Sequence, residues 1–265
     1  MASLAHFFCS HLSAENAVDP KQKLDAHRLR YAVYCEERGY EDPDRFSDKL
    51  ETDEFDDESV HSIIRHKQTA QPLGVVRLVL PNHRKLERHF PIERQFGHVF
   101  DQSRLRRFDF SRHNIAEVSR FAISKQSLKN ISCVTASQAR SCGDEEDDNA
   151  QAAKELIPHI SLGLIAMLFS VSQKHKISYW YAAMEPSLNR LLTRLGIRFT
   201  KIGPLMQYHG KRQPMIARVD DLLENIYRER PDFFELIDIL GGTVSFQQRL
   251  PVRWVANQEH LTSAH

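Results

Sequence analysis

The sequence predicts an α+β protein, a mixed α/β layer structure in which helices pack on one central sheet. Two features favour this class: short apolar runs with strand character follow one another between residues 59 and 124, and longer helical patterns flank them. The element order lacks the regular strand–helix alternation of a dinucleotide-binding fold, and no GxGxxG or GxxxxGK[ST] motif occurs. Such elements form layers around one core.

The first half of the chain predicts one helix and then three strands. Residues 22–38 have apolar positions at helical spacing and end before Gly39. Residues 59–66 and 73–81 are predicted to form a hairpin across the turn QTAQP, and residues 115–124 form a third strand.

The second half alternates helices and strands. In order, we expect a helix at 159–175, a strand at 177–184, a helix at 185–196, strands at 197–203 and 214–220, and a helical tail interrupted at Pro231. Residues 1–221 are predicted to form one domain, and 222–265 the tail. Within that domain, residues 125–158 include the acidic run SCGDEEDDNAQ, which favours a mobile loop or an insertion.

Composition excludes several classes of protein. The 265 residues are 41% hydrophobic and carry a formal net charge of +1, which selects neither nucleic acid nor an anionic membrane. The apolar run at 162–171 is short of the roughly 20 residues of a transmembrane helix, and the N-terminus lacks signal-peptide features. The four cysteines show no CxxC pair or zinc spacing, so we expect reduced thiols, no metal and a cytoplasmic location.

The strand at 115–124, IAEVSRFAIS, contains charged residues among apolar ones. Buried charge is costly unless it is paired or used in chemistry. By the two-residue period of a strand, Glu117 and Ser119 share one face, and Arg120 points to the other.

A second charge lies inside an apolar strand at Arg77, in GVVRLVL. This guanidinium needs a carboxylate partner, which Asp53, Asp56 or Glu117 can supply. An ion-pair network with a purely structural role remains the alternative to a functional site.

Four segments, RLRYAVYCEERGYE, LETDEFDD, GVVRL and AEVSRFAIS, resemble motifs of the acyl-homoserine-lactone synthases and their relatives in the GNAT superfamily. The order and local spacing agree. The aromatic residues of that family are typically Phe and Trp, whereas this sequence has tyrosine at both positions. The matching residues are Arg30, Tyr34, Tyr40, Asp53, Asp56, Arg77, Glu117, Ser119 and Arg120.

From about residue 24 to 240, the chain is similar to a sister group, the acyltransferases associated with exosortase/PEP-CTERM protein sorting, which are allied to N-acyl amino acid synthases. The segments that carry this resemblance are PHISLGLIAML, YWYAAMEPSLNRLLTRLGI and IGPLMQYHGKRQP. It implies a GNAT-type fold with a mostly antiparallel, twisted central sheet flanked by helices. The implied reaction transfers a fatty acyl group from a carrier thioester to the amine of an amino acid or a related small amine.

Under this resemblance Glu117 is the general base, and Ser119 and Arg77 are catalytic residues beside it. Apolar surroundings should raise the pKa of Glu117, while the arginines oppose that rise. Backbone N–H groups at 118–122, where GNAT strands commonly bulge, would hold the oxyanion. The acceptor would be bound by Arg30, Tyr34, Tyr40, Asp53, Asp56 and Arg120. The acyl chain would contact Phe121, Leu164, Met167, Leu168, Trp180 and Met184.

The donor is predicted from a missing motif. GNAT enzymes that use coenzyme A usually carry a Gly-rich loop after this strand, whose N–H groups cradle the pyrophosphate. Here SKQSLKNISC follows, without glycine. We therefore expect an acyl carrier protein as donor and partner, and no bound cofactor. The basic stretches 84–95 and 104–112 are predicted docking surfaces for this acidic protein.

Two alternatives remain open. An acyl-homoserine-lactone synthase using S-adenosylmethionine fits the same charged residues, although the chain length and the C-terminal half argue against it. A non-catalytic acyl-carrier or lipid-binding module would use the charges only for docking. Nucleic-acid binding and a serine hydrolase are disfavoured, because no recognition module and no G-x-S-x-G elbow occur.

Overall fold

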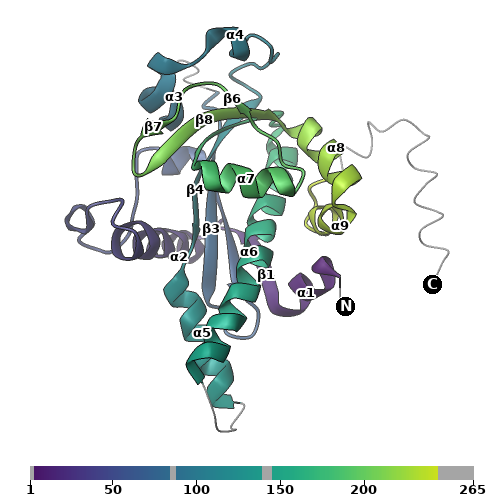
Figure 1. Cartoon of the computed structure of the whole chain (residues 1–265). Coiled ribbons are helices and arrows are strands. Elements are labelled where there is room, and N and C mark those ends of the chain that lie inside the picture. The colour runs from purple at the N-terminus through teal and green to yellow at the C-terminus, as the bar shows by residue number, and fades with distance from the viewer. Residues whose placement is uncertain (1–2, 84–87, 139–144, 244–265) are drawn as a thin grey trace, which may run out of the picture.

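The computed structural model describes residues 3–83, 88–138 and 145–243, and one sheet organises them (Figure 1). The sheet order is β1 (Leu12–Asn16), β2 (Ser59–His66), β3 (Pro72–Val79), β4 (Ile115–Ile123), β5 (Tyr179–Met184), β8 (Lys211–Arg218) and β6 (Thr200–Lys201), and β7 (Met206–Gln207) also pairs with β8. Neighbouring strands are antiparallel except for β4 and β5, which are parallel. The predicted fold class, a mostly antiparallel sheet flanked by helices, is confirmed.

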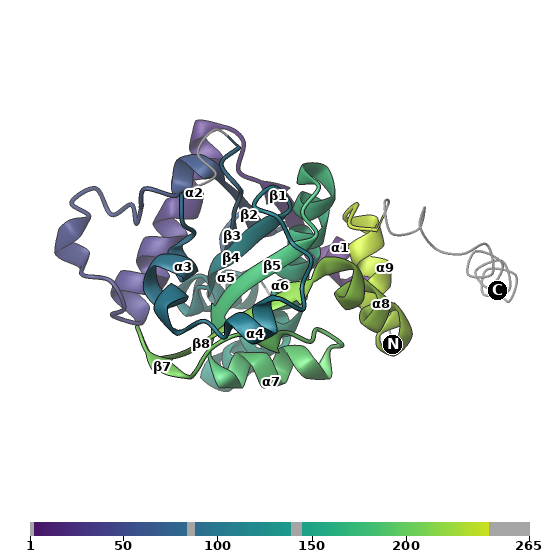
Figure 2. The ribbon, with the colours of Figure 1, turned by 90° about the horizontal axis from the view of Figure 1, so that it is seen from above.

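Helices cover both faces of this sheet (Figure 2). On one face lies α2 (Pro20–Tyr31), which continues into a π-helix (Ala32–Glu37). On the other face lie α5 (Lys125–Gln138) and α6 (Glu145–His175). The strand period explains this: Ile63 and Val75 belong to the buried cluster under α2, whereas the next residues, Ile64 and Val76, belong to the cluster under α6.

The other helices lie at the ends and along one side of the sheet. α1 (Leu4–His11) and α9 (Pro231–Ile239) pack against each other and against α6, and α8 (Val219–Glu229) packs against α9. The remaining helices are α3 (Pro91–Phe96), α4 (Gln102–Leu105) and α7 (Pro186–Arg194), with single 3-10 turns at Pro43–Arg45, Asp56–Glu58 and Gly97–Val99.

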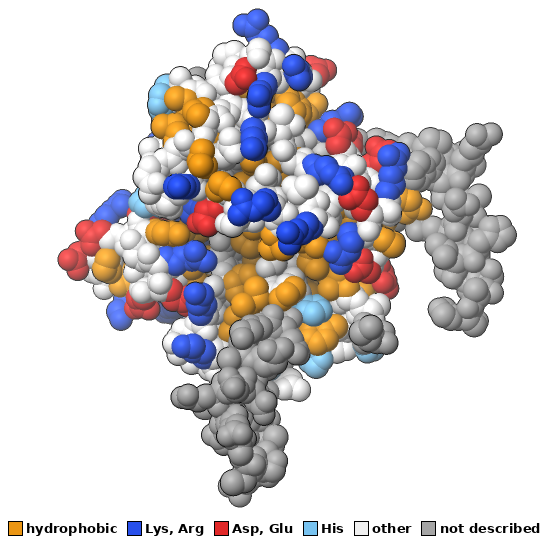
Figure 3. All heavy atoms as spheres, in the orientation of Figure 1, with side chains coloured by type: hydrophobic (Ala, Val, Ile, Leu, Met, Phe, Trp, Pro, Cys, Tyr) orange, Lys and Arg blue, Asp and Glu red, His pale blue; other side chains and the backbone are white. Residues whose placement is uncertain are grey.

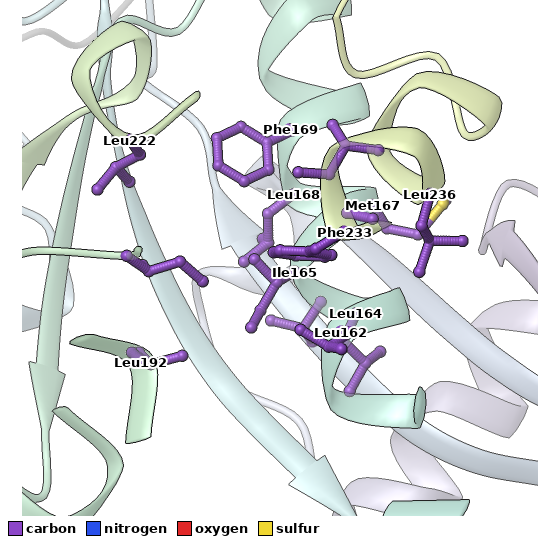
Figure 4. Packing of buried hydrophobic residues seen from close by; sticks show 14 of the residues in the cluster. Leu162, Leu164, Ile165, Met167, Leu168, Phe169, Leu192, Leu222, Phe233 and Leu236 are labelled. Carbon is purple, nitrogen blue, oxygen red and sulfur yellow. The ribbon is translucent and has the colours of Figure 1, made fainter. Parts of the chain in front are cut away.

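The main core forms around α6 (Figure 4). By length and composition alone, its segment Leu156–His175 could cross a membrane. The shorter apolar run at 162–171, considered from the sequence, did not indicate this. However, 61% of the segment Leu156–His175 is buried inside the protein, between the sheet and the helices α1, α8 and α9. Its apolar character is explained by having protein on most sides.

Two predictions about organisation are corrected. Of the two alternatives for 125–158, a mobile loop is wrong where the structure describes this range, because α5 and α6 occupy most of it, and an insertion stays a prediction; residues 139–144 lie outside the described residues. The predicted tail from 222 is helical with a break before Pro231, as expected, but it is no appendage. Its residues Leu223, Ile226 and Phe233 lie in the same buried cluster as the sheet. Residues 244–265 lie outside the description.

The sequence interpretation also missed elements at the N-terminus and after β3. It did not predict α1, β1, α3 or α4, and strand β6 is much shorter than the predicted 197–203. These are short elements, for which local periodicity provides few positions to compare.

Gly163 tests the close packing of α6 against α1. A Cβ atom there would lie 2.3 Å from Cε2 and 2.9 Å from Cζ of Phe8. We expect Gly163→Ala to lower the free energy of unfolding by about 1–3 kcal/mol, because the buried ring must move. The matched control is Gly97→Ala, whose Cβ would meet no atom closer than 4.0 Å. Equal stability of the two variants in urea denaturation would contradict this packing.

Candidate active site

The sheet separates at the point where β4 and β5 diverge. These strands pair from Ile115–Tyr179 to Val118–Ala182; beyond this point β4 continues along β3, and β5 continues along β8. A cavity of about 560 Å³ lies here, with walls from both strands, the π-helix, α6 and α7. Parallel neighbours that separate in this way leave an opening through the middle of the sheet.

A β-bulge lies at the same position. Ser119 is opposite Arg77 and Ala122 is opposite Val75, so β4 has one residue more than β3 between these pairs. Arg120 has a φ of 49°, a left-handed conformation that non-glycine residues seldom adopt. The bulge turns Arg120 to the same side of the sheet as Ser119. The prediction that Arg120 points to the opposite face is therefore wrong.

Six charged side chains form a closed ring of alternating sign on this side of the sheet. The N···O distances between neighbours are 2.5–3.4 Å. In order around the ring, the members are Arg30, Glu51, Arg120, Asp53, Arg77 and Asp56, which returns to Arg30. We call this set the charged ring.

The charged ring lowers the pKa of two of its carboxyl groups, Glu51 and Asp56. Burial raises the pKa of Glu51, but the neighbouring Arg30 and Arg120 outweigh it and lower this pKa to about 2. Burial also raises the pKa of Asp56, yet its hydrogen bond with His61 and the two adjacent guanidinium groups hold it well below its ordinary value.

Two residues of this network were missed by the sequence interpretation. Glu51 is 1% exposed and bridges Arg30 and Arg120. His61 is buried with Nε2 2.8 Å from Nη1 of Arg30, and burial lowers its pKa to about 4. The LETDEFDD segment contained Glu51, but nothing distinguished it from the other acids.

Glu117 stands apart from the charged ring. Its Oε2 accepts a hydrogen bond of 2.8 Å from the backbone N–H of Ile92, and Arg77 is not its ion-pair partner. Burial raises its pKa to about 8, because this hydrogen bond and the charges of Arg77 and Arg120 only partly offset the loss of solvation. A carboxyl with this pKa can exchange a proton near neutral pH.

Other polar residues of the cavity wall are oriented by hydrogen bonds and ring contacts. Nε of Arg77 donates to Oγ of Ser119 at 3.0 Å. The guanidinium carbon of Arg120 lies 5.3 Å from the ring centre of Tyr34, a cation–π contact. The Tyr40 hydroxyl donates to Oε1 of Glu185 at 3.4 Å. These residues form the polar end of the cavity.

The structure divides the predicted polar site residues into two groups. Arg30 and Asp56 do not line the cavity; they lie behind it in the charged ring, and Arg30 is fully buried. Their predicted direct binding of an acceptor is therefore not supported by the geometry. The predicted residues that do line the cavity are Tyr34, Tyr40, Asp53, Arg77, Glu117, Ser119 and Arg120.

The other end of the cavity is apolar. Of the predicted acyl-chain residues, the four that line it are Phe121, Leu168, Trp180 and Met184. Leu164 and Met167 do not line it: Leu164 lies against Gly74 of β3, and Met167 belongs to the buried cluster that also contains Leu236 of α9 (Figure 4). The wall from α7, including Leu188 and Leu192, was not predicted. In Figure 3, hydrophobic side chains lie in a hollow surrounded by basic ones.

His27, Asp56 and His61 are close enough to resemble a metal site, with one ligand atom of each within 4.8 Å of the others. However, Oδ1 of Asp56 already contacts Arg30 and Arg77, at 2.6 Å each. These guanidinium groups occupy the position that a cation would take, and their charge opposes metal binding.

The predicted basic docking surfaces are partly neutralised. Arg88 and Arg94 pair with Glu54, and Arg112 pairs with Glu93. Residues 84–87 lie outside the described residues. Of the second stretch, Arg106 and Arg107 are exposed. Carrier-protein docking stays a prediction.

Residues 29–133 match the family described as acetyltransferase (GNAT) domain. This part of the chain is therefore similar to a GNAT acetyltransferase domain. No curated protein matches the chain by sequence.

Solved structures show that the GNAT-like fold extends beyond these residues. TofI, in a ternary complex with an inhibitor and MTA, has a TM-score of 0.55 and 16% identity, covering 82% of this chain and 96% of that one. FeeM, an N-acyl amino acid synthase from uncultured soil microbes, has a TM-score of 0.53 and 16% identity, covering 83% and 97%. BjaI, a CoA-dependent acyl-homoserine lactone synthase solved with MTA, has a TM-score of 0.52 and 18% identity, covering 87% and 90%. The association with PEP-CTERM sorting stays a prediction.

Arg30 tests the energetics of the charged ring. We expect Arg30→Met to lower the free energy of unfolding by about 3–5 kcal/mol, because Glu51 and Asp56 then lose a buried partner. The control is Arg198→Met, which breaks an ion pair with Glu229 between side chains 45% and 42% exposed and should cost under about 1 kcal/mol. Similar losses in both variants, measured by urea denaturation, would contradict a buried ring.

Glu117 tests the raised pKa through stability. Between about pH 5 and pH 8 the unfolded chain loses this proton while the folded protein keeps it. Wild-type stability should therefore fall, relative to Glu117→Gln, by up to about 1.4 kcal/mol per pH unit across this range. Denaturation at a series of pH values measures the difference. A difference independent of pH would show that the pKa is not raised.

Proposed function

We propose that this GNAT domain is an N-acyltransferase that moves a fatty acyl group from an acyl carrier protein thioester to the amine of an amino acid or a related small amine. The observation that carries the proposal is the cavity itself. It connects a buried carboxyl of raised pKa, Glu117, with an apolar wall that includes Leu168 and Trp180. Acyl transfer to an amine needs a base, and a fatty chain needs apolar surface.

The proposed reaction forms a C–N bond and breaks a C–S bond. Glu117, in its ionised form, removes a proton from the acceptor ammonium, directly or through a water molecule. The free amine attacks the thioester carbonyl and gives a tetrahedral oxyanion. This intermediate expels the thiolate, which takes up a proton as the amide forms.

The bulge supplies a place for the oxyanion. Ser119 and Arg120 lie where β4 has one residue more than β3, so its backbone is not fully paired. An N–H group freed from the ladder can donate to a developing negative charge, and a fixed donor of this kind stabilises the transition state.

The ring residues at the cavity would orient the acceptor. Asp53 offers a carboxylate for an ammonium group, and Arg120 offers a guanidinium for a carboxylate. Arg77 would act by holding Ser119, with which it is hydrogen bonded. Arg30 and Asp56 would position these groups from behind the cavity wall.

Mass spectrometry of the products tests the proposal. Purified protein would be mixed with carrier protein loaded with C8 to C18 chains and with the twenty amino acids, or with S-adenosylmethionine in a separate reaction. We expect an N-acyl amino acid, and a rate about 10²–10⁴-fold lower for Glu117→Gln. The kcat/KM of the wild type should rise with pH around pH 8, as Glu117 ionises. The same rise should be absent in Glu117→Gln.

A matched control is Glu58→Gln, since Glu58 pairs with Arg88 outside the cavity. It should keep the wild-type rate. An acyl lactone from S-adenosylmethionine would instead establish the autoinducer-synthase alternative. Carrier-protein binding without any product, unchanged by Glu117→Gln, would indicate a non-catalytic binding module.

A further inference from the structure

The first turn of α5 also belongs to the cavity wall. Strand β4 ends at Ile123 and α5 begins at Lys125, and both of these residues line the cavity together with Leu128. At the start of a helix the backbone N–H groups have no partner within the helix, and they point toward any anion placed there. A donor bound in this cavity would meet this helix end.

The helix end is already occupied by a carboxylate of the chain itself. Oε2 of Glu37 accepts the N–H of Lys125 at 3.0 Å, and Oε1 accepts the N–H of Gln126 at 3.2 Å. The hydroxyl of Ser124 donates to Oε1 of Glu37 at 2.7 Å, and its oxygen accepts the N–H of Ser127 at 3.0 Å. The first three N–H groups of α5 are therefore satisfied without a ligand.

Glu37 reaches this position from another element. It is the last residue of the π-helix Ala32–Glu37, and it is half-buried against α5 although it lies 88 residues before Lys125. Its negative charge, placed at the positive end of a helix, is favourable. The same charge would repel a second anion at that point.

We propose that Glu37 is a specificity-determining residue that fills the anion position at α5 and so disfavours thioester donors that carry a diphosphate, such as acyl coenzyme A. This inference rests on the proposed acyl-transfer function. A carrier protein presents its thioester on an arm with a single phosphodiester, so it does not need the helix end. The exposed side chains of Arg38 and Lys125, which also line the cavity, remain available to that single phosphate.

The fold alone leaves the donor open. BjaI, with a similar fold, is described as CoA-dependent. A residue-level feature must therefore separate the donor classes, and Glu37 is such a feature at the helix end where an anion would bind.

Kinetics with matched donors test the proposal. Acyl carrier protein and coenzyme A would carry the same acyl chain, and kcat/KM would be measured for both donors. Wild type should prefer the carrier protein. Glu37→Ala, which empties the position, should raise kcat/KM for acyl coenzyme A about tenfold through a lower KM, with less than about a threefold change for the carrier protein.

Two further variants keep this experiment decisive. Glu37→Gln removes the charge but retains an oxygen that can accept the α5 hydrogen bonds, so it covers the case in which Glu37→Ala fails to fold. It should shift the preference in the same direction. Glu36→Gln, an exposed neighbour with the same change of charge, should leave it unchanged. An unchanged donor ratio in both Glu37 variants, or a wild-type preference for acyl coenzyme A, would overturn the proposal.

A binding measurement separates this inference from the proposed activity. Calorimetric titration with free coenzyme A needs no turnover, so it applies even if no acceptor yields a product. We expect tighter binding by Glu37→Ala and Glu37→Gln than by wild type or Glu36→Gln, by about tenfold. Equal affinities of all four proteins would refute a role for Glu37 in donor choice, whatever the outcome of the product analysis.

Discussion

The charged ring is the interaction on which the rest of the site depends. It joins three kinds of structure: Arg30 from α2, Arg77 and Arg120 from adjacent strands, and carboxylates from the segment at 51–56, which has little regular structure. Because the signs alternate, each charge is compensated by two neighbours, and every member of the ring is buried or half-buried. The ring therefore attaches an otherwise loosely structured segment to the sheet. It also gives the positive φ of Arg120 a reason to persist, since the bulge directs that guanidinium into the ring.

The ring also explains why neighbouring carboxyl groups differ in acidity. Glu51 is ionised because two guanidinium groups contact it directly, which lowers its pKa to about 2. Glu117 lies on the same side of the sheet, but among the described residues its direct partner is a backbone N–H alone, so burial dominates and raises its pKa to about 8. Arg77 and Arg120 form their ion pairs within the ring, so they lower the pKa of Glu117 only through longer-range charge interactions. A carboxyl group paired directly with arginine, such as Glu51, thus suits a structural role, whereas the carboxyl of Glu117, unpaired in the part of the chain that the structure describes, suits proton transfer.

The sequence was informative where a local rule applied. The strands around Arg77 and Glu117 followed from apolar runs. Of the three carboxylates predicted as partners of Arg77, Asp53 and Asp56 pair with it, and Glu117 does not. The side to which Arg120 points could not be predicted, because a two-residue period assumes a strand without an inserted residue. Glu51 could not be distinguished either, because its burial results from tertiary contacts with two distant arginines.

The errors on α6 have a similar origin. Helical spacing groups Leu164, Met167 and Leu168 into one apolar region, but the packing of β3 and α9 decides which of them face the cavity. The predicted loop before α6 was based on its acidic composition. That segment, EEDDNAQAAKEL, is also rich in residues that favour helices, and the helix continues into the buried part of α6.

The π-helix makes the position of the site sensitive to insertions and deletions of single residues. A π-turn holds more residues than an α-turn, and such turns are commonly found at functional sites. Loss of one residue from Ala32–Glu37 would restore α-helical geometry and rotate the following chain by about 100° about the axis of α2. Tyr34 and Glu37 could then not both keep their contacts with β4 and α5. In related chains, the length of this short segment should therefore vary less than its composition.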